Sequence, residues 1–278
     1  MQEELGIPEQ FYGDLYYYTY LRQIRSEHKH RELEFNLVLQ GTATYLVDGK
    51  RHDIRTGMII WLFPGQEHVL VRESPDFVMW IGVYKPDFVS KFCVSSSSYA
   101  LRQQKPDGDF CRCLRLDDAR WLLSVLTQLS HARSDVSLFN AGLGYTLLLA
   151  WSAYCSADEL GISSILHPAV NRAVQLLVEK PETESVEEIA REAGLSESRL
   201  RALFKAQTGV TLVDFRSYQR IWRFHKIYGN GQGMNITHTA LEAGFGSYTQ
   251  FHRVFKSIMG YGPAQFRRSL SITSGRKK

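Results

Sequence analysis

The C-terminal part of the chain contains one short pattern twice. The first copy starts at Ser196 and the second at Ser247, so the copies are offset by 51 residues (247 − 196). Matching residues follow both serines at the same distances, and the pairs are Leu200 and Phe251, Phe204 and Phe255, Lys205 and Lys256, Gly209 and Gly260, Phe215 and Phe266, and Arg216 and Arg267. A repeat that keeps its register over this length predicts two copies of one supersecondary unit.

Each copy is typical of a helix-turn-helix. In the first copy, residues 186–190 predict a helix, Gly194 supplies the turn that ends it, and Ser196 caps the next helix. On that second helix the predicted buried residues are Leu200, Leu203 and Phe204. In the second copy the predicted cap is Ser247, and the predicted buried residues are Phe251, Val254 and Phe255. A unit of this shape places its second helix in a groove of DNA.

The charge of the chain is divided between its two parts. Residues 1–166 carry 16 Lys and Arg against 20 Asp and Glu, a net charge of −4, whereas residues 167–278 carry 17 against 9, a net charge of +8. From Ser198 onwards, 14 basic residues stand against only Asp214 and Glu242, a net charge of +12. A basic block that follows a mildly acidic one predicts a domain that binds a polyanion.

The remaining residues on the two second helices are predicted to face outward. They are Ser198, Arg201, Ala202 and Lys205 in the first copy, and Tyr248, Thr249, His252, Arg253 and Lys256 in the second. On a recognition helix, outward residues near the N-terminal end contact base edges, and later Lys and Arg residues contact phosphates. Ordinary amphipathic helices would explain one such copy, but two copies in register within a basic segment favour DNA binding.

Residues 167–270 resemble the DNA-binding domain of the AraC/XylS family of bacterial transcription regulators. The residues that match the family pattern are Ile189-Ala190, Gly194-Leu195-Ser196, Leu200, Leu203-Phe204-Lys205, Gly209, Arg220-Ile221, Gly244-Phe245, Phe251, Arg253, Phe255-Lys256, Gly260 and Pro263. The resemblance implies that one long helix, over about residues 212–228, joins the two motifs. It also implies that the motifs bind successive major-groove segments on one face of DNA.

The resemblance also assigns roles to single residues. By position, those that face the bases are Ser198, Arg201, Ala202, Tyr248, Thr249, His252 and Arg253. The predicted phosphate contacts are Arg199, Lys205 and Lys256. The chain departs from the family pattern where Phe224 replaces the usual Ala and Thr239 replaces the usual Ile, and its loop over residues 229–233 is unusually rich in glycine.

Residues 16–92 read as a series of short strands. The runs with strand composition are residues 34–39, 43–47, 58–63, 68–71 and 77–84. Asp48-Gly49 lies between β-prone residues and is a strong signal of a tight hairpin. Many short strands separated by turn signals predict a barrel or a sandwich.

Histidines in this region are candidates for a binding site. The residues similar to the first signature of the cupin superfamily are His28, His30, Glu34 and Gly41, and those that resemble its second are Gly57, Pro64-Gly65 and His68. On adjacent strands of a small barrel, the three His and the Glu are candidates to bind Zn, Fe, Mn or Ni. The alternative is that they hydrogen-bond an effector, or one another, without a metal. AraC-type sensor domains are cupin-like binding pockets, so the resemblance favours this alternative. Aromatic candidates to line such a pocket are Tyr45, Trp61, Trp80 and Tyr84.

Two predicted helices follow the strands. Their apolar residues at helical spacing are Trp121, Leu122, Val125, Leu126 and Leu129, and then Leu143, Leu147, Leu148 and Trp151. Apolar spacing alone does not separate a face packed on the barrel from a dimer seam, so both alternatives stay open. The predicted organisation is a cupin-like barrel over residues 1–115, a helical dimerisation segment over 116–156, a linker over 157–166, a double helix-turn-helix domain over 167–270 and a basic tail over 271–278. The fold class is therefore α+β multidomain, with an all-β domain before an all-α one.

Several signals bear on the location of the protein. The four cysteines (Cys93, Cys111, Cys113 and Cys155) make no zinc-finger spacing, and we expect free thiols in a reducing compartment. The N-terminus lacks a basic region followed by an apolar core, so no signal peptide is expected. No apolar run is expected to reach the length that spans a membrane. These signals predict a cytoplasmic protein.

Together these features predict a one-component transcription regulator without catalytic residues. The expected partners are double-stranded promoter DNA, a small-molecule effector, a second copy of the chain in a homodimer, and RNA polymerase as a contact. One alternative is a metal-dependent cupin enzyme, a dioxygenase or isomerase, fused to a DNA-targeting module; its supporting feature is the set of His28, His30, Glu34 and His68. Another is a regulator that answers to protein partners through a purely structural barrel.

Overall fold

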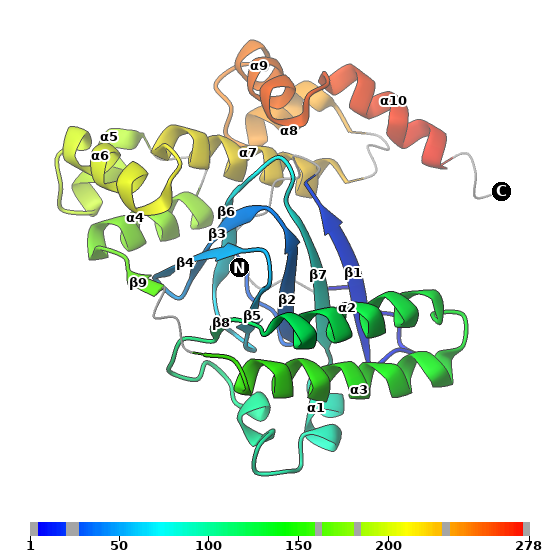
Figure 1. The fold of residues 1–278 in the computed structure, drawn as a ribbon. Coiled ribbons are helices and arrows are strands. Elements are labelled where there is room, and N and C mark those ends of the chain that lie inside the picture. Colours follow the sequence, from blue (N-terminus) through cyan, green and yellow to red (C-terminus); the bar gives the residue numbers. More distant parts are fainter. Residues whose placement is uncertain (1–4, 21–27, 159–162, 181–184, 230–233, 275–278) are drawn as a thin grey trace. The chain divides into compact units, whose positions relative to one another are not determined.

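The computed structural model describes residues 5–20, 28–158, 163–180, 185–229 and 234–274. The chain divides into two compact units: the N-terminal unit reaches to Ile165, and the C-terminal unit begins at Leu166. Strands dominate the first unit and helices make up the second (Figure 1). The predicted fold class, an all-β domain followed by an all-α domain, is confirmed.

The strands of the N-terminal unit form two antiparallel sheets. The first has the order β1-β7-β2-β5-β8, built from β1 (Gly13–Thr19), β7 (Val78–Tyr84), β2 (Leu33–Gln40), β5 (Met58–Leu62) and β8 (Cys111–Cys113). The second has the order β6-β3-β4-β9, built from β6 (His68–Glu73), β3 (Thr42–Val47), β4 (Lys50–Arg55) and β9 (Ser163–Ile165). The strand β9 lies inside the segment expected as a linker.

The hairpin between β3 and β4 turns at the predicted dipeptide. Asp48 and Gly49 have φ angles of 43° and 76°, the left-handed pair that a two-residue hairpin with the natural strand twist requires. The strand that follows, β4, has the polar sequence Lys-Arg-His-Asp-Ile-Arg, and only His52 and Ile54 are buried. It was not among the predicted strands, because a polar run acquires strand structure here only by pairing with β3.

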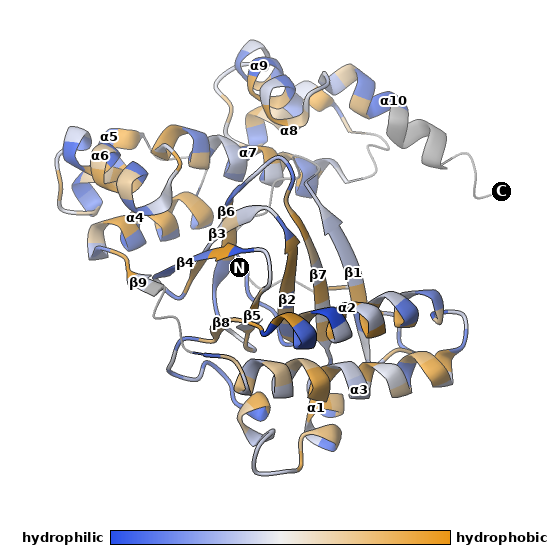
Figure 2. Ribbon diagram, in the orientation of Figure 1, coloured by the Kyte–Doolittle hydropathy of each residue, from blue (hydrophilic) through white to orange (hydrophobic). Residues whose placement is uncertain are grey.

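Residues of the first sheet point alternately to its two faces, and each face packs into a separate apolar core. Val38, Ile60 and Ile81 point between the two sheets and pack there with residues of β3, β4 and β6. Phe35, Ile59 and other residues of opposite parity pack on the outer face against α1 (Pro86–Phe92), α2 (Leu116–His131) and α3 (Val136–Cys155). Figure 1 shows α2 and α3 side by side on that face, and Figure 2 shows the strongly apolar strands between them and the second sheet. A short 3-10 helix, η1 (Tyr99–Arg102), lies in the same layer through Leu101.

Helix α3 corrects one prediction about the membrane. Its 20 residues are long and apolar enough, by length and composition, to cross a bilayer. The structure places Leu143, Leu147 and Trp151 of this helix in the outer core of the N-terminal unit, at 0%, 0% and 7% exposure. These buried positions identify α3 as a core helix, whose apolar character serves packing.

The C-terminal unit consists of helices. They are α4 (Pro168–Glu179), α5 (Val186–Glu192), α6 (Glu197–Thr208), α7 (Leu212–Tyr228), α8 (Ile236–Glu242), α9 (Tyr248–Met259) and α10 (Pro263–Ser274). The long helix implied over residues 212–228 is present as α7. Helix α10 continues to Ser274, into the segment predicted as a basic tail.

Candidate nucleic-acid interface and histidine cluster

The first helix-turn-helix consists of α5 and α6. Gly194 takes the left-handed turn that ends α5, with a φ angle of 71°. Ser196 occupies the N-cap of α6 as predicted, but its side chain makes no cap hydrogen bond. Helix α5 begins instead with a capping box, in which Ser185 and Glu188 each accept a hydrogen bond from the backbone N–H of the other. This Ser-x-x-Glu pattern was available in the sequence and was missed.

The second helix-turn-helix consists of α8 and α9. Asn235 caps α8 by accepting from the backbone N–H groups of Thr237 and His238. Gly244 turns the chain with a φ angle of 97°, and the Ser247 hydroxyl accepts from the Gln250 N–H at 3.2 Å. The serine at the matching position therefore forms the predicted cap in this copy and not in the other.

Both second helices end at a left-handed glycine. Gly209 follows α6 with a φ angle of 79°, and Gly260 follows α9 with a φ angle of 80°. In each case the glycine N–H donates to the carbonyl of the lysine four residues earlier, Lys205 or Lys256. A residue with a Cβ is disfavoured in this conformation, which explains why both copies carry glycine here.

The predicted buried faces are largely confirmed. Leu200, Phe204, Phe251 and Phe255 are all 0% exposed, while Leu203 and Val254 are half-buried. Phe224, the first departure from the family pattern, lies on α7 against α9, with ring centroids 4.5 Å from Phe251 and 5.8 Å from Phe255. The extra ring is thus absorbed into an aromatic core of the second motif.

Every residue predicted to contact DNA lies on an exposed surface of α6 or α9. The exposed residues are Ser198, Arg199, Arg201, Ala202 and Lys205 on α6, and Tyr248, Thr249, His252, Arg253 and Lys256 on α9. In the part of the chain described, Arg201 is the residue of this set that forms an ion pair within its own helix. Its Nη2 atom lies 2.6 Å from Glu197 Oε1. Burial, and secondarily the like charge of Arg201, lower the pKa of Arg216 on α7, which indicates closely spaced cations beside α6.

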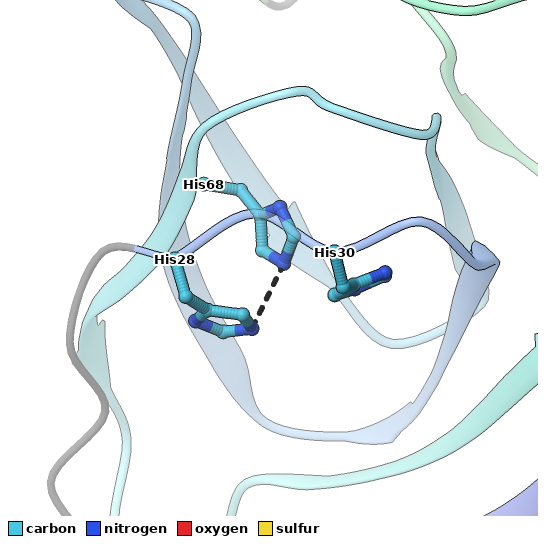
Figure 3. Close-up of side chains that lie close together, drawn as sticks. All are labelled: His28, His30 and His68. Carbon is cyan, nitrogen blue, oxygen red and sulfur yellow. Dashed lines mark hydrogen bonds between the residues drawn. The ribbon is translucent and has the colours of Figure 1, made fainter. Parts of the chain in front are cut away.

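The three histidines of the N-terminal unit converge at one place. The backbones of His28 and His68 exchange two N–H···O bonds of 3.0 Å each, so the two residues form a directly opposed antiparallel pair. Their side chains consequently lie on the same face, with the two Nε2 atoms 3.1 Å apart (Figure 3). One ring nitrogen of each of His28, His30 and His68 lies within 4.8 Å of the others, and the exposures are 9%, 3% and 2%.

Glu34 stands behind this cluster rather than within it. Its Oε2 atom lies 3.1 Å from His30 Nε2, and its Oε1 atom accepts from Asn36 Nδ2 at 2.8 Å. Three histidines therefore converge, and the carboxylate of Glu34 bonds to one of them. The arrangement follows from the strands, because Glu34 lies on β2 whereas His28 and His30 precede β2 and His68 begins β6.

Protonation differs among these groups. Burial opposes ionisation of Glu34, but the hydrogen bond and charge of His30, the charge of His68 and the Asn36 bond lower its pKa to about 2. Burial also acts against the charged form of His30, yet its contacts with Glu34 and Glu32 raise its pKa overall. Burial and the neighbouring charge of His28 lower the pKa of His68 well below its usual value.

Two hollows of the N-terminal unit are candidates to admit a small molecule. A groove of about 860 Å³ lies beside the cluster, and its lining includes His30, Arg31, Leu33, Lys85, Val89 and Arg102. A smaller pocket of about 140 Å³ is lined by His52, Trp61, Lys105 and Phe110, among others. Of the aromatic residues predicted to line a pocket, Trp61 does so here, and its buried Nε1 atom lacks a hydrogen-bond partner within the part of the chain described.

The helices beside the sheet present a second apolar face. Leu122, Leu126, Leu143 and Leu147 are buried against the sheet, so for these residues the core alternative holds. Leu138, Tyr145 and Leu148 lie along the opposite side of α3 and are 57%, 48% and 38% exposed. Trp121 of α2 is 56% exposed.

Comparison with known proteins relates each of the two units to a known domain family. A model of the AraC-like ligand binding domain matches residues 11–148, and a model of a helix-turn-helix domain matches residues 189–269. The chain is 26% identical over 256 residues to the thermoregulatory protein LcrF of Yersinia pestis, covering 89% of this chain and 93% of that protein. It is 35% identical over 79 residues to the arabinose operon regulatory protein of Escherichia coli, covering 28% of this chain and 27% of that protein.

Among solved structures, ToxT from Vibrio cholerae aligns over 93% of this chain and 98% of its own, with 15% identity and a TM-score of 0.37. A ligand-binding domain followed by a helix-turn-helix domain defines a transcription regulator. The chain belongs to the AraC family of these regulators, as the resemblance of its repeat implies. The relatives are regulators rather than enzymes, so the enzyme alternative is not supported.

Proposed function

We propose that the protein is a sequence-specific DNA-binding regulator whose affinity for promoter DNA is controlled by a small molecule in the N-terminal unit. The observation that carries the proposal is the pair of recognition helices, α6 and α9, each with an inward apolar face and an exposed face of polar and basic residues. Such a face meets base edges with its N-terminal residues and phosphates with its later cations.

The two recognition faces are unlike. Helix α6 presents Ser198, Arg201 and Ala202, and at the matching positions α9 presents Thr249, His252 and Arg253. Unlike side chains prefer unlike base pairs. Each chain therefore reads an asymmetric DNA site, with the phosphate contacts supplied by Arg199, Lys205 and Lys256.

The effector site belongs to the N-terminal unit. The groove beside His30 combines apolar residues such as Leu33 and Val89 with cations such as Arg31 and Arg102, a mixture that suits a small polar or anionic molecule. Such an effector acts through its different affinity for two states of the regulator. His30 lines the groove itself and bonds to Glu34 behind it.

The regulator acts as a homodimer in the cytoplasm and contacts RNA polymerase at the promoter. Support for the dimer comes from the exposed apolar stripe Leu138, Tyr145 and Leu148 of α3, which is spaced at helical intervals. Support for a cytoplasmic location comes from the four cysteines, which are free thiols, as expected in a reducing compartment.

The test is DNA binding by the full chain. Fluorescence anisotropy compares DNA from upstream of its own operon with a scrambled duplex of equal length and composition, at one fixed salt concentration. We expect at least about 10³-fold tighter binding to the upstream DNA, the lower end of typical specificity ratios. Equal affinity for the two duplexes would contradict the proposal.

A further inference from the structure

The histidine cluster has the geometry of a set of metal ligands. His28 and His68 point their Nε2 atoms at each other across 3.1 Å. Two nitrogens bound to one tetrahedral zinc ion, at about 2.0–2.1 Å from it, lie about 3.4 Å apart. The third histidine, His30, offers a ring nitrogen within 4.8 Å of the other two.

The partners of the outward ring nitrogens support the same interpretation. A metal-bound histidine donates its other N–H to a carboxylate or a backbone carbonyl, which fixes the ring. His68 does this through Nδ1, which lies 3.1 Å from the Gln66 carbonyl and leaves Nε2 facing the cluster. His30 has both kinds of partner, the Glu32 carbonyl at 3.0 Å and the Glu34 carboxylate at 3.1 Å. With Nδ1 of His30 on the ion, Nε2 keeps the Glu34 carboxylate as its acceptor.

Backbone hydrogen bonds also hold the segments that carry the three histidines in position for metal binding. Besides the paired backbone bonds of His28 and His68, the His30 carbonyl accepts from the Gly65 N–H at 2.9 Å. The three residues are at least nine-tenths buried, and the Nε2 atoms of His28 and His68 lie within hydrogen-bond distance of each other. Three imidazoles, without any of the four cysteines nearby, suit zinc, nickel, iron or copper rather than magnesium or calcium.

We propose that His28, His30 and His68 bind one first-row divalent metal ion, best matched by zinc, and that Glu34 is the positioning residue for His30. The ion fastens the segment of His28 and His30 to the start of β6. This inference is independent of the proposed DNA binding, which can stand or fall separately.

The experiment uses the full chain and zinc alone. The protein is stripped with chelator, dialysed against zinc, and its metal content and thermal unfolding are measured. We expect one zinc ion per chain and an unfolding temperature that rises with free zinc, since an ion that binds only the folded state stabilises it by mass action. Cobalt in place of zinc should give the visible bands of a tetrahedral ion without a cobalt–thiolate charge-transfer band.

Variants separate this site from unspecific binding. His68→Gln removes a ligand and should abolish stoichiometric zinc binding. Glu34→Gln keeps all three ligands and the shape of the core, and should weaken zinc binding by about 10–100-fold, as loss of a positioning partner does. His52→Gln changes another buried histidine of the same unit outside the cluster and should leave zinc binding unchanged.

The proposal fails if the stripped, folded wild type takes up no stoichiometric zinc and its unfolding temperature does not respond to zinc. It also fails if His52→Gln loses as much affinity as Glu34→Gln, because binding would then not reside in the cluster. Circular dichroism of each variant shows that it is folded before its metal content is compared. Should His68→Gln not fold, the comparison of Glu34→Gln with His52→Gln decides the matter alone.

Discussion

At the scale of single residues, the proposed DNA recognition depends on exposed side chains that differ between α6 and α9, whereas the buried positions of the two helices are apolar in both. Arg253 on α9 occupies the position of Ala202 on α6 (253 − 51), so one helix offers a guanidinium where the other offers a methyl group. An arginine forms two parallel hydrogen bonds to guanine, whereas a methyl group contacts the methyl of thymine. We therefore expect the two positions to prefer different bases.

Arg253→Ala should lower discrimination between the preferred site and random DNA by about 1–3 kcal/mol, or roughly 5–150-fold, because a bidentate base contact is lost. Competition binding against random duplex measures this ratio. Arg268→Ala is the matched control, since Arg268 is an exposed arginine of the same unit on α10. Unchanged discrimination in Arg253→Ala would remove this residue from the base-reading face.

Lys256→Ala should weaken binding to all DNA sequences alike and reduce the slope of log affinity against log salt by about 0.9, because one phosphate contact is lost. Lys205→Ala should do the same on the first helix. Salt titrations of binding give the slope directly. The control Lys180→Ala changes an exposed lysine at the end of α4 and should leave the slope as it is. A wild-type slope in Lys256→Ala would exclude the phosphate contact.

The prediction of single residues succeeded where helical periodicity alone decides which way a side chain points. The outward faces of α6 and α9 follow from which residues must be buried, and all ten predicted DNA contacts are exposed. It failed where a hydrogen bond depends on exact geometry. Ser196 holds the cap position without its hydrogen bond.

At the scale of elements, α7 joins the two motifs and carries a partly buried titratable group. His225 packs on Phe224, Phe255 and Phe266, with centroid distances of 5.7, 5.8 and 4.8 Å. Its Nε2 atom lacks a hydrogen-bond partner in the described residues, and burial lowers its pKa below the usual 6.5. The neutral imidazole thus behaves as part of an aromatic core.

His225 should make the second motif sensitive to acid. Since the folded state has the lower pKa, the unfolded chain takes up a proton first, so stability is complete above about pH 6.5 and falls as the pH decreases toward the folded value. His225→Leu should reduce this loss. Hydrogen exchange of α7 and α9 peptides at pH 7.5 and pH 5.5 measures it. An equal loss of protection in the variant would show that other groups govern the acid response.

Element prediction was best for long periodic helices and weakest for short pieces. Helix α7 and the paired helices of the repeat were expected, because their apolar faces recur over several turns. The strands β4 and β9 and the helix α1 were missed. Each is short, and its structure depends on pairing or packing with distant residues, as β9 depends on β4.

At the scale of the molecule, the exposed apolar stripe of α3 predicts association. Tyr145→Glu places a charge in the middle of the stripe and should weaken dimerisation at least about tenfold, as an unpaired charge in an interface does. Sedimentation over a concentration series measures it. Val94→Glu is the control, since Val94 is 73% exposed and lies outside α3. A monomeric wild type, or a Tyr145→Glu variant that associates normally, would contradict the dimer.

The change in the period of apolar residues near residue 117 predicted where the helices α2 and α3 begin within the N-terminal unit. The division between the two units was predictable from the net charge, which reverses after residue 166. The effector was not predictable. The hollows depend on how distant segments meet, as where the loop carrying Lys105 covers Trp61. No local sequence pattern predicts which distant segments will line the same hollow.

The central claim is that one chain carries two unlike DNA readers. Selection of binding sites from a random DNA library by the purified full chain tests it most directly. The account predicts an enriched motif with two different halves about one helical turn apart, and loss of the half read by α9 in Arg253→Ala. Enrichment of a motif with two identical halves within the footprint of one chain, or no enrichment, would contradict the account.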